Sequence, residues 1–475
     1  MQVTPSIRVT ETLTDNVDLS AAGQAKSDWI TLVSPSLFVV SRGARVEGTL
    51  RASVNAALYG EDNSRNNNFV NLNGTGRVTA IENLAFVDLL GSISKETISV
   101  FGSRPADEVT GSKNLTEVKS FGISPYLLGR FASTGKAELR YNYVATDSAF
   151  SGFQNSRQKI WTANLTDATA FGNLGWGLNF RDSLTEQTNQ RDLKLQTLRF
   201  TGFGQLTPQL QTRLIVGSEE NNYAASGLKR STIVGAGADI QFAPRSKFSG
   251  TWEDRFYGPG YLFSVEHSTG LFNLSGRYSK DVSYTSQSLT GVSSLYGILA
   301  QLNCPDLATR DSCMRPLLAA NPGIDKFGVS QTVLNNGVYL DRRATFSASY
   351  LGAPRTMYVF SGFRSERNSL VDQSFTYTGD FQTSTRVTDV SGSLLVSHKL
   401  TPITSANADY TLIRSHNEPN GVNAYFSSRT QRITVGVATA FTPKANGTLS
   451  YRYGKAAGTS PYTENAVIGS LMVNF

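Results

Sequence analysis

Apolar and polar residues alternate with a period of two along much of this chain. Four segments show the alternation clearly: residues 137–143, 174–181, 272–279 and 449–453. The second of them reads LGWGLNFR, with its large apolar residues at every other position. Successive side chains of a β-strand point to opposite faces, so each segment has one apolar and one polar face. The pattern predicts an all-β protein, and alternation alone fits a soluble sandwich as well as a membrane barrel.

The lengths of the predicted strands favour the membrane barrel. We expect about 22 strands, within a range of roughly 18 to 24, and many of them run for about 11 to 16 residues. Soluble strands cluster near five or six residues, whereas a tilted strand needs about 9 to 11 to cross the hydrocarbon of a bilayer. No stretch approaches the run of about 18 apolar residues that a transmembrane helix needs.

The connections between strands alternate between tight turns and long polar stretches. Tight turns are predicted at Gly43, Thr134–Gly135, Asn173, Thr207–Pro208, Ala243–Pro244, Gly270–Leu271, Ala353–Pro354, Thr401–Pro402 and Thr442–Pro443. Long connections are predicted at 15–27, 61–67, 96–116, 148–155, 222–229, 288–338, 369–385 and 457–464, and the short Tyr257–Gly260 is the exception. Short periplasmic turns and long extracellular loops are typical of an outer-membrane barrel. A soluble sandwich has no reason to sort its loops in this way.

The whole chain, residues 1–475, is therefore predicted to be one transmembrane antiparallel β-barrel with both termini on the short-turn side. Every backbone polar group in lipid must be satisfied within the protein, so the sheet has to close. The apolar face then points to lipid and the polar face to the lumen. Aromatic girdles are expected from residues such as Tyr141, Tyr143, Tyr257, Tyr261, Tyr451 and Tyr453.

The N-terminal residues carry no visible secretory signal, because residues 1–17 lack a charged region followed by an apolar one. Either the chain is not exported or the signal is removed before the numbered chain, and the barrel pattern favours removal and a location in the outer membrane. Strand patterning begins within the first ten residues. We therefore expect no plug domain ahead of the first strand.

The composition narrows the chemistry. Charged residues make up 17% of the chain, and the 3 His and 2 Cys exclude zinc fingers, Cys-ligated iron–sulfur clusters and haem arrays. Cys304 and Cys313 both lie in the 288–338 connection, where a disulfide is expected in an oxidising compartment and two free thiols are the alternative. That connection is expected either to cap or narrow the pore or to be a plain surface loop.

Several residues at lumen positions are charged. The basic ones are Arg140, Arg181, Arg213, Arg277 and Arg452, with Glu138 and Glu253 as acidic counterparts. The chain has a net charge of +7 and a pI of about 9.2. Arginines lining a pore favour anions, so preference for anions or acidic saccharides is one hypothesis. The alternative is that these arginines pair with acids on neighbouring strands and hold the wall.

An enzymatic function is not indicated. In the sequence VEHSTG, His267 and Thr269 share a face whereas Ser268 points away, so nucleophile and base do not meet. His398 and His416 stand alone, and no H-E-x-x-H, G-x-S-x-G or phosphate-binding motif occurs. We expect no cofactor. Lys and Arg are dispersed, which argues against nucleic acid and favours outer-membrane lipids and lipopolysaccharide as partners.

The chain end TENAVIGSLMVNF places Val467, Leu471, Val473 and Phe475 on one face. It resembles the C-terminal strand signal read by the barrel assembly machinery, and a plain amphipathic last strand is the alternative. The segments LTPITSANADYTLIRS and VGVATAFTPKANGTLSYRYGKA, with the opening VTPSIRVTETLTDNVDL, resemble an uncharacterised outer-membrane β-barrel family. Its members accompany exosortase (PEP-CTERM) sorting systems and extracellular polysaccharide gene clusters of Gram-negative bacteria. The resemblance implies this context and transfers no functional residue.

These observations predict a porin-like outer-membrane channel for diffusion or export of polar solutes, with a polysaccharide or a secreted protein as potential cargo. The alternative is a non-conducting structural barrel that docks surface polysaccharides or partner proteins.

Overall fold

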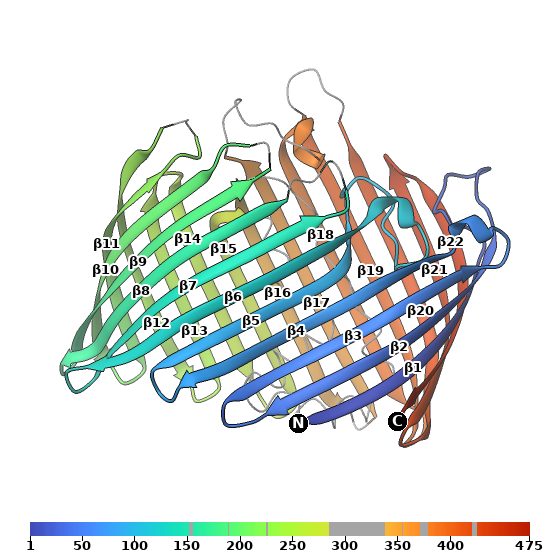
Figure 1. Ribbon diagram of the computed structural model, residues 1–475, viewed down its shortest axis with the longest axis horizontal. Helices are drawn as coiled ribbons and strands as arrows, with labels where there is room; N and C mark the ends of the chain where they lie inside the picture. The colour runs from blue at the N-terminus through green and yellow to red at the C-terminus, as the bar shows by residue number, and fades with distance from the viewer. Residues whose placement is uncertain are drawn as a thin grey trace.

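Twenty-two strands form one closed antiparallel barrel in the computed structural model (Figure 1). The structure describes residues 1–150, 152, 155–188, 190–224, 227–284, 338–353, 355–370, 379–419 and 425–475. The first and last strands pair with each other, from Ser6 opposite Asn474 to Thr14 opposite Ala466. This pairing leaves no free edge, so the predicted barrel and its strand number are confirmed.

The strands run in chain order around the barrel, each next to its sequence neighbour. Their bounds are β1 Gln2–Thr14, β2 Asp28–Arg42, β3 Val46–Tyr59, β4 Asn67–Ile81, β5 Ala85–Thr97, β6 Leu115–Phe131, β7 Gly135–Ser148, β8 Ser156–Phe171, β9 Leu174–Gln187, β10 Leu193–Thr207, β11 Leu210–Asn221, β12 Lys229–Ala243, β13 Ser246–Arg255, β14 Gly258–Ser268, β15 Phe272–Tyr284, β16 Val338–Ala353, β17 Thr356–Ser369, β18 Ser384–Lys399, β19 Thr404–Pro419, β20 Ser427–Thr442, β21 Ala445–Gly458 and β22 Tyr462–Asn474. The described part of the chain has short 3₁₀ turns in its connections: η1 Asn63–Arg65, η2 Ser112–Asn114 and η4 Gly379–Gln382. No helix among these described residues is long and apolar enough to cross a membrane.

Both termini lie at the end of the barrel that carries the tight turns (Figure 1). The turn after β2 is closed by a hydrogen bond from Gly43 N to Val46 O at 3.0 Å. The longer connections lie at the opposite end, which we call the extracellular end. Only two residues separate β13 from β14 there, as the sequence suggested for Tyr257–Gly260.

The side chains of each strand sort by parity, with apolar groups outside and polar groups inside. Strand β19 shows this clearly, because Asn407, Asp409 and Thr411 are buried on the inner face whereas Tyr410 is exposed on the outer face. On β11 the outward Leu214 is 71% exposed, which a soluble protein would not tolerate along a whole wall. This inside-out arrangement is the one that a bilayer stabilises.

Aromatic side chains gather on the outer wall. The rings of Tyr141 and Trp161 pack in a tilted arrangement with centroids 4.7 Å apart, and Tyr261 stacks on Tyr278 at 5.0 Å. These pairs occupy adjacent strands, so they form the cross-strand contacts expected of a girdle. Tyr257 instead lies at the connection between β13 and β14, where its hydroxyl contacts Asp281 at 3.2 Å.

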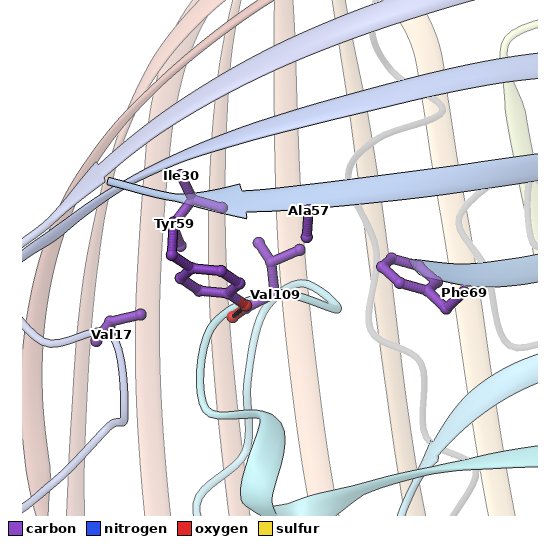
Figure 2. Packing of buried hydrophobic residues seen from close by; sticks show 6 residues of the cluster. All are labelled: Val17, Ile30, Ala57, Tyr59, Phe69 and Val109. Carbon is purple, nitrogen blue, oxygen red and sulfur yellow. Dashed lines mark hydrogen bonds between the residues drawn. The ribbon is translucent and has the colours of Figure 1, made fainter. Parts of the chain in front are cut away.

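The long connection between β5 and β6 turns into the barrel. Residues 98–114 between β5 and β6, which we call the inner segment, pack against the inward faces of strands on both sides of the β1–β22 seam. Figure 2 shows Val109 of this segment among Val17, Ile30, Ala57, Tyr59 and Phe69, all of which are buried. The sequence placed this stretch with the other extracellular loops, and its inward course was not predicted.

The 288–338 connection, apart from Val338 at the start of β16, lies outside the described residues. Cys304 and Cys313 fall in that part of the chain. Their disulfide, and a capping role for this connection, stay predictions.

Candidate functional site

The inner segment is held to β18 and β19 by a buried arginine. Arg104 Nη2 contacts Asp389 at 3.2 Å and donates to Ser415 Oγ at 2.8 Å, and its side chain is 8% exposed. Asp389 also forms an ion pair with Arg367 on β17. Because Arg104 donates to Val100 O as well, the same side chain fixes the fold of the segment and its position on the wall.

A second ion pair holds the segment to β21. Asp107 Oδ2 accepts from Arg452 Nη1 at 2.7 Å, and Arg452 also pairs with Glu464 on β22 at 2.6 Å. The other oxygen of Asp107 accepts hydrogen bonds from the backbone and side chain of Thr110 at 2.7 and 2.8 Å. Arg452 was predicted to line the pore. The structure places it under the inner segment, where its guanidinium is paired with Asp107 and Glu464.

On the opposite side of the seam the segment packs against β2, β3 and β4. Val109 belongs to the apolar cluster of Figure 2, and Val109 O accepts from the Tyr59 hydroxyl at 2.7 Å. Glu108 Oε2 accepts from Asn71 on β4 at 2.8 Å. The segment is therefore fastened at both ends of its path across this part of the lumen.

The segment is also rigid in itself. Asn114 donates to Ser99 O at 2.9 Å and to Ser103 O at 2.8 Å, which draws its two ends together. Gly111 has a φ of +59°, where side chains are rarely tolerated, and its N–H donates to Val17 O at 2.8 Å. A Cβ atom at that position would lie 2.5 Å from Leu19 Cδ1.

Burial and charge act in opposite directions on the ionisable groups of the segment. Burial raises the pKa of Asp107, but the Arg452 guanidinium and the hydrogen bonds from Thr110 outweigh it, so the pKa lies below its usual value. Burial lowers the pKa of Arg104 despite the nearby Asp389. Asp380 in η4 accepts from Ser99 Oγ at 2.5 Å, and burial raises the pKa of its carboxyl. Asp107 therefore stays ionised more readily than Asp380 as pH falls.

A cavity of about 210 Å³ lies between the inner segment and the inner wall of β1 and β19–β22. Arg8, Arg432, Asn407 and Asp409 line it, together with Asp107 and Val109 of the segment. Asn407 is 4% exposed, and its Oδ1 accepts no hydrogen bond from the described part of the chain. Polar groups of the wall therefore line the cavity beside apolar ones such as Leu32 and Ile468.

Most of the predicted lumen arginines are paired with acids on the inner wall. Arg140 contacts Asp88 at 2.8 Å and Glu138 at 3.1 Å, and Arg213 pairs with Asp239. A further pair that joins β10 to β13 links Arg199 to Glu253 at 3.2 Å. Arg181 and Arg277 stand at inward positions of β9 and β15. The ion pairs of Arg140, Arg213 and Arg452 therefore support the hypothesis that these arginines hold strands of the wall together.

Two of the three histidines, His267 and His398, form cross-strand contacts at the periplasmic end. His267 Nδ1 lies 2.7 Å from Ser246 Oγ, and His398 Nδ1 lies 2.8 Å from Thr356 Oγ1, each with its directly opposite neighbour. No carboxylate of the described residues orients His267 through a hydrogen bond. Within the same ranges, no group of three or more His, Cys, Asp or Glu residues could hold a metal ion. Both histidines thus contact the residue directly opposite on the neighbouring strand, as side chains that stabilise strand pairing do.

The C-terminal residues predicted as an assembly signal lie where the barrel closes. Leu471 is exposed on the outer face of β22, Val473 lies on the same face, and Phe475 N donates to Pro5 O at 2.9 Å. This geometry is compatible with either of the roles raised for the chain end. Its recognition by an assembly machinery stays a prediction.

The residues that the sequence did not single out are Arg104, Asp107, Asp380 and Asp389. The only local signal was the run RPADEV, in which charges are flanked by the apolar Val100, Phe101 and Val109. Apolar residues at both ends of a charged loop suggest that the loop packs on something. Their partners lie hundreds of positions away, so the sequence could not identify them.

Solved structures share this architecture. The FrpB iron transporter from Neisseria meningitidis (F3-3 variant) matches with a TM-score of 0.51 and 9% identity over 99% of this chain and 81% of that chain. The apoprotein form of its F5-1 variant matches with a TM-score of 0.50 and 10% identity, again over 99% and 81%. The siderophore receptor PirA from Acinetobacter baumannii covers 100% of this chain and 80% of its own, with 9% identity and a TM-score of 0.49. At such identities the likeness shows the fold alone, an outer-membrane barrel.

No protein-family model matches the sequence, and no curated protein matches it either.

Proposed function

We propose that this chain is an outer-membrane transport barrel for small polar solutes, and that the inner segment sets the width of the passage. The observation that carries the proposal is the double anchoring of residues 98–114 inside the lumen, through Arg104 to Asp389 and through Asp107 to Arg452. A loop without a role in passage has no need of two ion pairs whose arginines are both buried. Buried pairs offset a large desolvation cost only when their geometry is specific.

The side chains of the inner wall favour a polar solute over an apolar one. Hydroxyl, amide and guanidinium groups line the cavity beside the inner segment, including Thr10, Asn407 and Arg432. Because Arg140, Arg213 and Arg452 are neutralised by acids, the fixed field that they exert on a solute is weak. We therefore expect neutral polar solutes to pass, with a modest preference for anions over cations.

The solved structures with this fold include proteins named as an iron transporter and as a siderophore receptor. Their likeness favours passage of a solute through the barrel and does not identify the solute. The association with exosortase and polysaccharide systems, implied by the resemblance of both chain ends, stays a prediction. Neighbouring polysaccharide synthesis genes would favour export over diffusion.

Single-channel recording in planar bilayers tests the proposal. The informative variant replaces residues 100–110 by a Gly/Ser linker of the same length, which removes both ion pairs and keeps the connection between β5 and β6. We expect a severalfold larger conductance than that of the unmodified barrel. The matched control replaces η1, Asn63–Arg65, which lies at the same extracellular end and pairs with Asp18 outside the inner segment.

The outcomes separate the two functions. A larger conductance in the linker variant alone supports the proposal. Equal conductance in all three proteins shows that the inner segment does not set the width. Silence of all three favours the non-conducting docking barrel. A reversal potential in a salt gradient tests selectivity, and a cation-selective result overturns the expected anion preference.

A further inference from the structure

One sector of the outer wall carries an excess of positive charge at its extracellular end. Each of the six consecutive strands β16–β21 presents one cation at an outward-facing position there, and we call this set the cationic row: Arg342, Arg364, Arg386, Arg414, Arg429 and Lys455. The outward carboxylates that the structure describes in this sector are Glu366 and Glu418. Six cations against two carboxylates leave the sector strongly cationic.

The few acids in the row are shared. Glu366 lies within 3.3 Å of Arg342, 3.5 Å of Arg386 and 3.7 Å of Arg364, so one carboxylate serves three guanidinium groups. Glu418 contacts Arg386 at 2.7 Å. Arg364 remains 63% exposed. Among the described residues, no carboxylate lies within ion-pair distance of Arg414.

Three arginines of the cationic row lie at one level across neighbouring strands. Arg364 lies opposite Val390, Val390 opposite Arg414, and Arg414 directly opposite Arg429. Like charges placed directly opposite on one face of a sheet repel each other. An anion bound between Arg414 and Arg429 would relieve that repulsion.

The row lies at the boundary between the apolar outer wall and the extracellular rim. Toward the extracellular rim, the outward side chains of β19 run from Tyr410 through Leu412 to Arg414. On β20, which runs in the opposite direction, they run from Ile433 through Gln431 to Arg429. Tyr410 is 41% exposed and Ile433 is 43% exposed on this wall, as lipid-facing groups are. The headgroups of the outer leaflet meet the protein at this height.

The other side of the barrel provides a contrast. On β6–β12 four outward cations near the extracellular end have carboxylates of their own: Lys119 with Glu117 at 3.0 Å, Arg157 with Asp147 at 2.9 Å, Lys159 with Glu186 at 2.5 Å and Arg230 with Glu220 at 3.3 Å. A fifth, Lys194 at the start of β10, has no carboxylate within ion-pair distance among the described residues. Excess positive charge is therefore a property of β16–β21 and not of the whole rim.

We propose that the cationic row is a binding site for the phosphate groups of an outer-leaflet glycolipid, lipopolysaccharide, lying with its acyl chains against β16–β21. Guanidinium groups match phosphate oxygens in a fork geometry and form charge-assisted hydrogen bonds with them. The acyl chains fit the apolar wall directly below the row. This site lies on the outside of the barrel and does not depend on passage through the lumen.

The test is equilibrium binding by native mass spectrometry in detergent, with three probes: lipopolysaccharide, the same glycolipid with its phosphates removed, and inorganic phosphate. The variant Arg364→Gln/Arg414→Gln/Arg429→Gln removes the three cations of the cationic row that lie at one level. We expect a loss of roughly fivefold for each arginine, about 100-fold in all, for lipopolysaccharide. The control Lys119→Gln/Lys159→Gln/Arg230→Gln removes the same charge from the balanced sector, and its affinity is expected to stay within about twofold.

Several results would overturn the proposal. Equal losses in the two triple variants would show that only net charge matters. Unchanged binding of the dephosphorylated glycolipid would exclude recognition of phosphate. Inorganic phosphate binding as tightly as the lipid would make the row a site for the free ion. Should the triple variant fail to fold, the single change Arg414→Gln is expected to weaken binding about fivefold, and an unchanged affinity would refute the site.

Discussion

A substitution at Arg104 removes one anchor of the inner segment and leaves every strand of the barrel unchanged in sequence. We consider Arg104→Met, which keeps an unbranched apolar stem and removes the guanidinium. Methionine cannot donate to Asp389, Ser415 or Val100 O. The inner segment then keeps its Asp107 anchor and its apolar cluster but has no hold on β18 and β19.

The size of the effect follows from the burial of the pair. Arg104 and Asp389 are 8% and 6% exposed, and removing one partner of a buried ion pair costs about 3 to 5 kcal/mol. Asp389 keeps Arg367 and Ser415, so the lower value of about 3 kcal/mol applies. The loss falls on the state with the segment in place, because a displaced segment makes none of these contacts. About 3 kcal/mol corresponds to a roughly 150-fold shift toward the displaced state.

Single-channel recording measures that shift as the fraction of time spent at the higher conductance. We expect this fraction to rise roughly 150-fold in Arg104→Met, up to saturation. The matched control is Arg230→Met, which removes the same charge from an outer-wall pair in which the arginine is 75% exposed. An open fraction of Arg104→Met within about twofold of the control would refute the reasoning that this ion pair holds the segment in place.

Two further predictions concern the same segment. Gly111→Ala introduces a side chain at φ +59° and 2.5 Å from Leu19 Cδ1, so we expect it to destabilise the barrel by about 1 to 3 kcal/mol in denaturant titrations. The matched change Gly270→Ala, with nothing within 4 Å, should cost much less, and equal costs would contradict this account. Because the pKa of Asp107 is lowered beside Arg452, its stabilisation is fully present above the unfolded value of about 4 and is lost as pH falls through the folded pKa. The open fraction of Asp107→Asn should therefore exceed that of the unmodified barrel by a constant factor from pH 7 to about 4, and the factor should shrink toward one below that pH.

The strand architecture was predictable because its signal is local and repeated. Alternation along each strand, as in LGWGLNFR at residues 174–181, reports which face points to lipid, and the turns fall at the predicted places, as at Gly43. In a barrel each strand pairs with its chain neighbours, so local order determines most of the topology. Only the closing pair, β1 with β22, is distant in sequence.

The inner segment was not predictable because its contacts are distant. Arg104 and Asp389 are separated by 285 positions, and Arg452 and Asp107 by 345. Polar residues in a long connection predict an exposed loop, and nothing in the RPADEV run identifies a partner on β18 or β21. The same reasoning explains why Arg452, which was expected to line the pore, was not expected to hold a loop.

The order of synthesis gives the inner segment a further consequence. Residues 98–114 are made early, whereas Asp389, Ser415 and Arg452 belong to strands made near the end of the chain. Contacts between distant parts of a chain form late, because the intervening loop must first be ordered. An incomplete barrel therefore has neither a finished wall nor a fastened segment. The strands from β18 to β22 complete both together, because they close the sheet onto β1 and also supply Asp389, Ser415 and Arg452.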